Sequence, residues 1–484
     1  MSTREDCLNL IAGAHTPSAA GTWFDKLEPA TGTLLARVAA GAQADVNAAV
    51  SAARNQFDAG PWASLSGAAR ARLIHRLADL LEARSEFFAE LLAREQGRAI
   101  MEMRLLDIPM AVDTLRYFAG WADKLEGRQI PTAGFMGRPT FNYTVRDAMG
   151  VAALIVPWNA PLMIGAWKLA PALAAGCTVV IKPSEDAPLA LTALASLSVE
   201  ACFPEGVINV VQGLGPEVGR ALVVHPGVDK ISFTGSTVVG RDIAAAAGPL
   251  FKRLTLELGG KAPKIILPDA PLEQAIAGCA MGLFVDQGQT CAAGSRILVH
   301  RSLHGAVCQA LAGAADSLVL GDPLAAGTQM GALISARHAE RVRAHIARAV
   351  AQGATLETRG GPLPGQGFFV RPAILSGVTS GMDIAREEVF GPVGAIIPFD
   401  TEEEAIHLAN DCAYGLSATL WTQDLSRAHQ IAARLRVGAV AINGWSPLDA
   451  RLPWGGIKES GIGNDLSRSA LDAYLTEKVI TLVM

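Results

Sequence analysis

The 484-residue chain lacks the features that mark several classes of protein. Its net charge is −5 and no run of lysine and arginine forms a basic arm, which argues against nucleic acid as a partner. Its seven cysteines are scattered and contain no CxxC pair, which predicts reduced thiols in a cytoplasmic protein. His300 and His304 lack the glutamate of an HExxH motif, so no metal site is expected.

No secretory signal and no membrane span are expected either. Residues Met1–Asp6 carry an acidic pair and no apolar run. The segment Ala148–Trp167 is long enough to cross a bilayer, but Pro157, Asn159 and Pro161 would break a spanning helix at its middle. A hydrophobic content of 50% and a charged content of 18% instead predict a soluble globular chain, with room for roughly three domains.

Helical periodicity dominates the chain before residue 126. Apolar residues recur with helical spacing from Ala69 to Gln96, which predicts one amphipathic helix that Gly97 caps. A second helix is predicted over Leu105–Leu125. The segment Gly127–Thr144 is rich in glycine, proline and threonine, and Phe141–Val145 alternates like an exposed strand. We therefore expect a protruding hairpin or arm there.

Short apolar runs then alternate with helical segments. Strands are predicted at Val151–Val156, Thr178–Lys182, Val207–Val211, Lys230–Phe233 and Arg253–Glu257, with helices at Pro161–Ala175, Pro188–Cys202, Glu217–His225 and Thr237–Ala247. This alternation predicts an α/β fold with a doubly wound parallel sheet. Ligands of such sheets bind beyond the carboxyl ends of the strands.

The alternation resumes after Lys261 and predicts a second α/β domain. Helices are expected at Leu272–Phe284, 302–318, 335–352, 402–411 and 424–436, and strands at Ile297–His300, Ala395–Pro398, Ala418–Trp421 and Ala439–Asn443. The tail Ala473–Val483 is rich in β-forming residues and could pair with the arm.

One cysteine stands out by its local sequence. Cys291 follows a Gly288–Thr290 bend inside the weakly charged stretch Phe284–Arg296. Free cysteines are usually buried and inert, whereas a reactive thiol needs a partner that lowers its pKa or removes its proton. Position alone leaves both interpretations of Cys291 open.

Two loops could bind a pyrophosphate. Gly213–Gly219 approximates the GxGxxG pattern with one residue too many, and Phe233–Gly240 runs from a strand into a helix through small residues. Backbone N–H groups and the helix dipole at such a turn favour phosphate. An ordinary tight turn remains the alternative for either loop.

Lys182 and Glu185 follow a neighbouring strand and could bind ribose hydroxyls. The carboxylate would repel a 2′-phosphate, which favours NAD over NADP. The alternative is a solvent-facing helix N-terminus, where Ser184 and Glu185 are common residues.

Seven motifs, in this order, resemble those of the NAD(P)-dependent aldehyde dehydrogenase superfamily over essentially the whole chain. They are Pro157-Trp-Asn159, Lys182-Pro-Ser-Glu185, Phe233-Thr-Gly-Ser236, Leu256-Glu-Leu-Gly-Gly-Lys261, Gly288-Gln-Thr-Cys291, Glu388-Val-Phe-Gly-Pro392 and Pro453-Trp-Gly-Gly-Ile-Lys-Glu-Ser-Gly461.

The resemblance implies a catalytic role for three residues. The Cys291 thiolate would attack the aldehyde, and the Asn159 side chain and the Cys291 backbone N–H would hold the oxyanion. Hydride transfer to NAD would leave a thioester, which water activated by Glu257 would hydrolyse. Superfamily members that transfer the acyl group to coenzyme A lack this glutamate, so Glu257 favours a carboxylic acid product.

The resemblance also implies the residues of the cofactor and substrate sites. Glu388 would hold the nicotinamide ribose and Phe390 would lie beside the ring. The other expected cofactor residues are Trp158, Lys182, Ser184, Glu185, Gly215, Gly219, Phe233, Gly235, Ser236 and Val239. The expected aldehyde tunnel consists of Ala160, Met163, Trp167, Val285, Thr290, Leu448 and Trp454.

The expected tunnel contains no charged residue, which predicts an apolar aldehyde, aromatic or medium-chain aliphatic. Alanine at 160 replaces an aromatic residue of many family members and should leave more room. Arg451 would change this prediction only if it turned inward, and a solvent-facing side chain is expected.

The domain organisation follows the same resemblance. Segments 1–126 and 148–256 would bind NAD, 257–456 would form the catalytic domain, 457–470 would return to the NAD-binding domain, and 127–147 with 471–484 would form a β oligomerisation arm. An apolar strand edge invites pairing with another subunit, so a homodimer or homotetramer is expected.

Three other functions remain to be separated from this one. They are a CoA-acylating dehydrogenase, a cysteine hydrolase that acts on esters without cofactor, and a catalytically silent binding protein. Dependence of NADH formation on coenzyme A would distinguish the CoA-acylating dehydrogenase from the hydrolytic enzyme. The nucleotide motifs oppose the second, and the presence of Cys291, Glu257 and Asn159 opposes the third.

Overall fold

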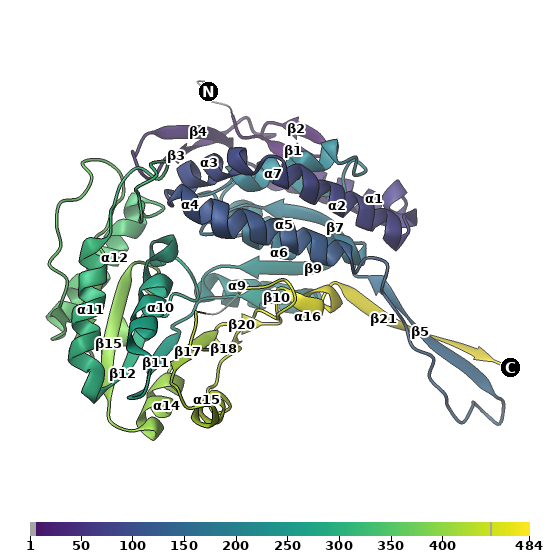
Figure 1. Ribbon diagram of the computed structural model, residues 1–484. Helices are drawn as coiled ribbons and strands as arrows, with labels where there is room; N and C mark the ends of the chain where they lie inside the picture. Colours follow the sequence, from purple (N-terminus) through teal and green to yellow (C-terminus); the bar gives the residue numbers. More distant parts are fainter. Residues whose placement is uncertain (1–5, 446–447) are drawn as a thin grey trace.

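The computed structural model describes residues 6–445 and 448–484. Figure 1 shows two sheets covered by helices, with a long two-stranded arm projecting away from them. The prediction of no secretory signal rests on Met1–Asp6, of which residues 1–5 lie outside the described part. Among the described residues, no helix is both long and apolar enough to cross a membrane.

The first sheet has eight strands, of which the five central ones run parallel. Their order is β2 (Ala14–Thr16), β1 (Asn9–Ile11), β8 (Ile208–Val210), β7 (Thr178–Lys182), β6 (Val151–Ile155), β9 (Lys230–Thr234), β10 (Arg253–Glu257) and β20 (Gly461–Ile462). The winding reverses between β6 and β9, which confirms the predicted doubly wound sheet. A crevice for a ligand is expected beyond the carboxyl ends of these two strands.

Both faces of this sheet are buried under helices. Ala152 and Leu154 of β6 belong to one apolar layer, whereas Val151, Ala153 and Ile155 belong to the other. The first layer contains α2 (Gly67–Glu82), α3 (Ser85–Gln96), α5 (Ile108–Ala119), α6 (Pro161–Ala175) and α7 (Leu189–Glu200); the second contains α1 (Gln43–Asp58), α8 (Arg220–Val224) and α9 (Thr237–Ala247). Burial on both faces explains why these strands are continuous apolar runs.

The second sheet has seven strands, all parallel except the first. Their order is β13 (Thr355–Leu356), β14 (Ala373–Ser376), β15 (Val393–Phe399), β12 (Arg296–His300), β11 (Pro263–Ile266), β17 (Ser417–Trp421) and β18 (Ala439–Ile442). Its two apolar layers contain α10 (Leu272–Phe284) and α11 (His304–Ser317) on one face, and α12 (Ala336–Ala351), α14 (Glu402–Asn410) and α15 (Leu425–Ala432) on the other. The predicted second α/β unit is confirmed.

The arm consists of β5 (Thr140–Ala148) and β21 (Leu475–Val483), which pair antiparallel along their whole length. Figure 1 shows this ribbon extending from the body of the molecule to the carboxyl terminus. The predicted pairing of the tail with the earlier arm is therefore present. The remaining elements are β3 (Trp23–Leu27), β4 (Leu34–Ala39), α4 (Ile100–Glu102), α13 (Asp383–Arg386), β16 (Tyr414–Gly415), β19 (Ile457–Lys458) and α16 (Ser467–Asp472).

The two long helices predicted before the arm are interrupted. The helix predicted over Ala69–Gln96 is two helices, because the chain turns at Ala83 and Arg84. The apolar residues keep a helical spacing across this turn, so their pattern does not reveal it. Gly97 does cap the second helix, with φ at 75°. The helix predicted over Leu105–Leu125 begins as a π-helical turn at Met103–Asp107 and ends at Ala119. Apolar spacing alone does not detect such local breaks.

Candidate active site

Cys291 lies on a tightly held loop that follows α10. Asp286 and Gln287 adopt left-handed backbone conformations, with φ of 54° and 51°. Gly288 is also left-handed, and a Cβ there would lie 2.4 Å from the Gly391 carbonyl oxygen, so only glycine fits. The Gln287 side-chain amide donates to the carbonyl oxygen of Gly97 at 3.0 Å. The loop is thus fixed by its own backbone and by a distant segment of the chain.

The Cys291 thiol is half-buried in surroundings that keep it protonated. Burial, followed by the carboxyl groups of Glu388 and Glu257, raises the pKa of the Cys291 thiol to about 12. A Cβ on Gly260 would lie 2.4 Å from the Cys291 carbonyl oxygen, so the connection between β10 and β11 approaches this loop closely. A thiol in this setting needs a neighbouring base before it can act as a nucleophile.

Glu257 ends β10 and supplies a carboxyl group beside the thiol. The residue is 4% exposed, and neither of its carboxyl oxygens has a hydrogen-bond partner among the described residues. Burial raises the pKa of Glu257 well above its usual value, Asp465 raises it further, and Lys168 opposes the rise. A carboxyl group with a raised pKa is suited to accept a proton near neutral pH.

A buried ion pair that the sequence did not reveal lies next to Glu257. The Lys168 ammonium is 2.7 Å from an Asp465 carboxylate oxygen, and both side chains are buried. Lys168 also donates to the Ser232 hydroxyl at 3.1 Å. Because α6 carries the lysine and the segment before α16 carries the aspartate, only the folded chain brings them together. No local pattern could have identified this pair.

Asn159 stands at the amino end of α6, directly beyond β6. It is 7% exposed, and its backbone oxygen accepts a hydrogen bond from the Arg98 guanidinium at 3.2 Å. Burial raises the pKa of the Asp286 carboxyl group well above its usual value, and Arg98 and the Asn159 side chain oppose the rise. Asn159 and Cys291 line the same cavity, so the amide lies on the wall that a bound carbonyl would face.

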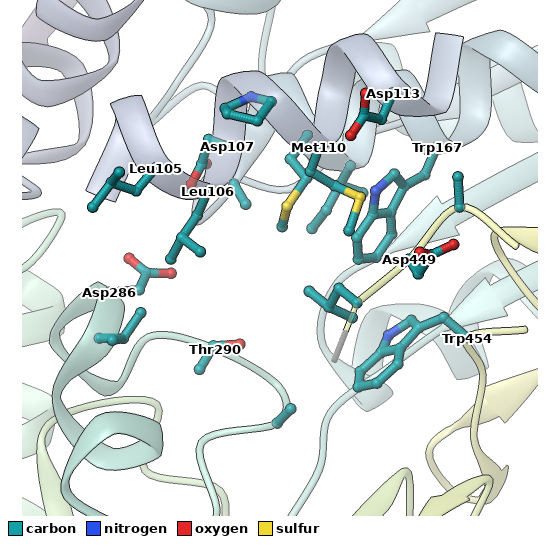
Figure 2. Close-up of a pocket in the computed structure, with 18 of the residues that line it drawn as sticks. Leu105, Leu106, Asp107, Met110, Asp113, Trp167, Asp286, Thr290, Asp449 and Trp454 are labelled. Carbon is teal, nitrogen blue, oxygen red and sulfur yellow. The ribbon is translucent and has the colours of Figure 1, made fainter. Parts of the chain in front are cut away.

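That cavity has a volume of about 840 Å³ and contains all seven residues expected in the aldehyde tunnel. Trp167 and Trp454 are buried in its wall, and Ala160 is 3% exposed. The expectation of an uncharged wall is incomplete, because charged residues line it too: Arg98, Asp107, Asp113, Arg116, Asp286, Asp449 and Arg451. Figure 2 shows Asp107, Asp113, Asp286 and Asp449 distributed around the cavity.

Arg98, Asp107, Asp113 and Arg116 were missed because they come from helices and loops far from the recognised motifs. Arg451 is 75% exposed and pairs with Asp449, which agrees with the expected outward orientation. The Arg451 guanidinium lowers the pKa of Asp449 to about 2. Asp113, on α5, has no ion-pair partner within the described residues. The cavity wall therefore contains more carboxyl groups than arginines that lack an ion-pair partner.

A second cavity of about 820 Å³ lies beyond the carboxyl ends of β6, β7 and β9. It is lined by ten of the twelve expected cofactor residues: Trp158, Lys182, Ser184, Glu185, Gly215, Gly219, Phe233, Gly235, Ser236 and Val239. The Lys182 ammonium lies 2.9 Å from a Glu185 carboxylate oxygen. Burial alone would raise the pKa of Glu185, but Lys182 lowers it, so this carboxylate is ionised at the cavity wall.

The other two expected cofactor residues lie near Cys291. Glu388 accepts a hydrogen bond from the Gly260 backbone N–H at 2.8 Å. Phe390 has a left-handed φ of 58°, and its ring meets that of Trp158 edge to face, with centroids 5.2 Å apart. His338 donates to the Phe390 carbonyl oxygen at 2.7 Å. Trp158 thus connects the second cavity to the residues around the thiol.

The fold and the site together define a class of enzyme. A doubly wound sheet with a cavity at its switch point is typical of dinucleotide-dependent oxidoreductases, and a thiol beside an amide donor and a carboxyl base is typical of covalent catalysis on a carbonyl. Comparison with known proteins makes this specific. Residues 15–480 match the Aldehyde dehydrogenase family, and the chain belongs to that family.

Individual relatives agree over nearly the full length. The chain is 45% identical to the DhaS protein of Bacillus subtilis (strain 168), over 97% of this chain and 94% of that one. It is 41% identical to the mitochondrial aldehyde dehydrogenase of Homo sapiens, over 95% of this chain and 88% of the relative. An NAD+ complex of an aldehyde dehydrogenase from Bacillus cereus superposes with a TM-score of 0.97 at 43% identity, over 99% and 97% of the two chains.

Proposed function

We propose that this enzyme oxidises an aldehyde to the carboxylic acid with NAD, through a covalent thioester on Cys291. The observation that carries the proposal is that Cys291 and Asn159 line one cavity, while the buried Glu257 carboxyl group acts electrostatically on the Cys291 thiol. The Cys291 thiolate attacks the carbonyl carbon to form a thiohemiacetal. The Asn159 amide and the Cys291 backbone N–H stabilise the oxyanion, and the loss of one such donor costs about 10²–10³ in rate.

The second cavity would hold NAD, which would supply the acceptor for the hydride that leaves the thiohemiacetal carbon. The residues present fit this cofactor, because the second cavity combines the capped amino end of α9 with an ionised carboxylate at Glu185. A carboxylate at this place accepts ribose hydroxyls and repels a 2′-phosphate, which favours NAD, with NADP less favoured. We assign the nicotinamide ribose to Glu388 and the nicotinamide ring to the neighbourhood of Phe390.

Glu257 then removes a proton from the water that hydrolyses the thioester. Its unpartnered carboxyl oxygens and its raised pKa suit a general base that takes one proton per turnover. The same group can take the thiol proton at the start of the cycle. A CoA-acylating reaction would not need this base, so NADH formation without coenzyme A is the expected behaviour, and strict dependence on coenzyme A would contradict the proposal.

We propose an uncharged aldehyde with an apolar body, aromatic or medium-chain aliphatic, as the substrate. Met163, Trp167 and Trp454 offer it an apolar wall, and Ala160 leaves space beside the thiol. Asp113, which has no ion-pair partner within the described residues, adds a carboxylate to the same wall and opposes an aldehyde that carries its own carboxylate. In a panel of benzaldehyde, hexanal and succinate semialdehyde, the highest kcat/KM for succinate semialdehyde would refute this substrate class.

We further propose that the enzyme assembles through its arm into a dimer or tetramer in the cytoplasm. β21 pairs only with β5 among the described strands, and its exposed residues include Val479, Leu482 and Val483. An apolar edge of this kind suits a second subunit. Replacing Val479 and Leu482 by lysine should lower the mass measured by sedimentation, and a monomeric wild type would contradict the assembly. All seven cysteines are unpaired, which suits a reducing compartment.

A further inference from the structure

A buried cluster of charge lies directly behind the oxyanion donor. Arg98, which follows α3, is 4% exposed in its side chain and reaches three carboxyl groups. Its guanidinium lies 3.0 Å from Glu102, 3.0 Å from Asp107 and 3.1 Å from Asp286. It also donates to the backbone oxygen of Asn159 at 3.2 Å. One cation therefore serves three carboxyl groups and one carbonyl, and all four side chains are largely buried.

The cluster joins three separate segments of the chain. Arg98 and Glu102 belong to the segment between α3 and α5, Asn159 lies two residues before α6, and Asp286 belongs to the turn that leads to Cys291. The backbone N–H of Asp286 donates to a Glu102 carboxylate oxygen at 3.0 Å. The same turn has the left-handed backbone at Asp286, which the surrounding contacts must maintain.

The geometry bears on the direction in which the Asn159 amide points. A side-chain NH₂ group has two hydrogens. Asn159 lines the cavity that Cys291 also lines, so this group can donate towards a carbonyl oxygen held there. Arg98 holds the Asn159 backbone and the Asp286 carboxyl group at the same time. It therefore ties the oxyanion donor to the turn that leads to Cys291.

We propose that Arg98 is a positioning residue for the oxyanion site, acting through Asn159 and Asp286. The inference rests on the proposed function, in which Asn159 stabilises the oxyanion. Packing alone would not require this residue, because an apolar side chain of similar volume often replaces a buried ion pair at no cost in stability. A planar guanidinium can bind several groups in fixed directions, whereas the ammonium of lysine is a flexible point charge.

The test is a double-mutant cycle between Arg98 and Asn159. Arg98→Lys retains the positive charge among the carboxyl groups but loses the planar fork. Since a displacement of about 1 Å can cost about 10²-fold in rate, Arg98→Lys should lower kcat about 10-fold or more. The KM for the aldehyde should remain within about twofold, because the donor acts on the transition state. In the Asn159→Ala background, Arg98→Lys should change kcat by less than about twofold.

A second pair of variants keeps the test valid if Arg98→Lys folds poorly. Asp286→Asn tolerates the left-handed backbone, since asparagine is among the residues enriched there, but removes the carboxyl group that lies 3.1 Å from the Arg98 guanidinium. Asp286→Asn should also lower kcat, and this loss of kcat should disappear in the Asn159→Ala background. Arg54→Lys is the matched control, because Arg54 pairs with Asp229 at the opposite end of the sheet. It should leave kcat unchanged.

Two results would overturn the positioning role. One is a wild-type kcat in both Arg98→Lys and Asp286→Asn. The other is a loss of the same size with and without the Asn159 side chain, which would indicate a general structural effect. An inactive wild type would instead contradict the proposed function, so the two failures are distinguishable. NAD binding, followed by fluorescence, should be unchanged in Arg98→Lys.

Discussion

Replacement of Glu257 by glutamine separates the two halves of the reaction. Glutamine keeps the size of the side chain but cannot accept the proton of the attacking water. General-base catalysis contributes about 10²–10⁴ in rate, so steady-state kcat should fall by that factor. The carboxyl oxygens of Glu257 have no hydrogen-bond partner within the described part of the chain, so the substitution should not disturb the surrounding structure.

The assay is rapid mixing of the variant with aldehyde and NAD. The variant should give a burst of NADH close to one equivalent per active site, followed by very slow turnover. The burst should form more slowly than in the wild type, because Cys291 loses a base that can take its proton but can still be acylated. Intact-mass measurement should show the acyl group on the protein. Glu273→Gln, an acidic residue in the first turn of α10, is the control and should keep wild-type kcat. A variant with no burst and no acyl adduct would refute the assignment of Glu257 to thioester hydrolysis.

The same substitution has a consequence for stability. The folded-state pKa of Glu257 is raised, so the folded protein holds this proton to higher pH than the unfolded chain does. Stability is therefore lost as pH rises from the unfolded pKa towards the folded one. Glu257→Gln should have a higher Tm than the wild type near neutral pH, and the difference should disappear at a pH below the unfolded pKa of glutamate. An equal Tm difference at both pH values would contradict the buried, unpartnered state of Glu257.

The remaining predictions concern the ion pair and the cofactor. Because Lys168 lowers and Asp465 raises the pKa of Glu257, the rising limb of the pH–kcat profile should move to higher pH in Lys168→Met and to lower pH in Asp465→Asn; shifts in the same direction would contradict the electrostatic account. Glu185→Gln should raise kcat/KM for NADP relative to NAD, and an unchanged ratio would remove Glu185 as the cause of the preference.

The regular parts of the fold could be predicted from the sequence because burial on both faces leaves a simple signal. The strands β6 and β7 are short apolar runs between helices, and both appear where the pattern predicts them. The strand β11 was missed, because its four residues include Pro263 and Lys264. The Lys264 side chain is buried, and its ammonium donates to the Gly278 carbonyl oxygen at 2.9 Å. A charged residue satisfied by a distant carbonyl gives no strand signal in a local window.

The site residues also fall into two groups, those that a local motif predicts and those that it does not. Residues such as Ser236 and Glu185 lie on continuous motifs at the ends of strands, so a short stretch of sequence is enough to predict their role. Arg98 and Lys168 act through Asp286 and Asp465, which are far away in sequence. Their roles depend on the assembly of segments that no single stretch of sequence describes. Tertiary contacts, rather than motif content, were therefore the missing information.

Replacement of Cys291 by alanine tests the central claim most directly. The variant should bind NAD with the affinity of the wild type, since Cys291 lies outside the residues that line the second cavity. It should produce almost no NADH from any aldehyde in the panel and should carry no acyl group in an intact-mass measurement. A variant that kept wild-type NADH production would show that the oxidation does not pass through a thioester on Cys291.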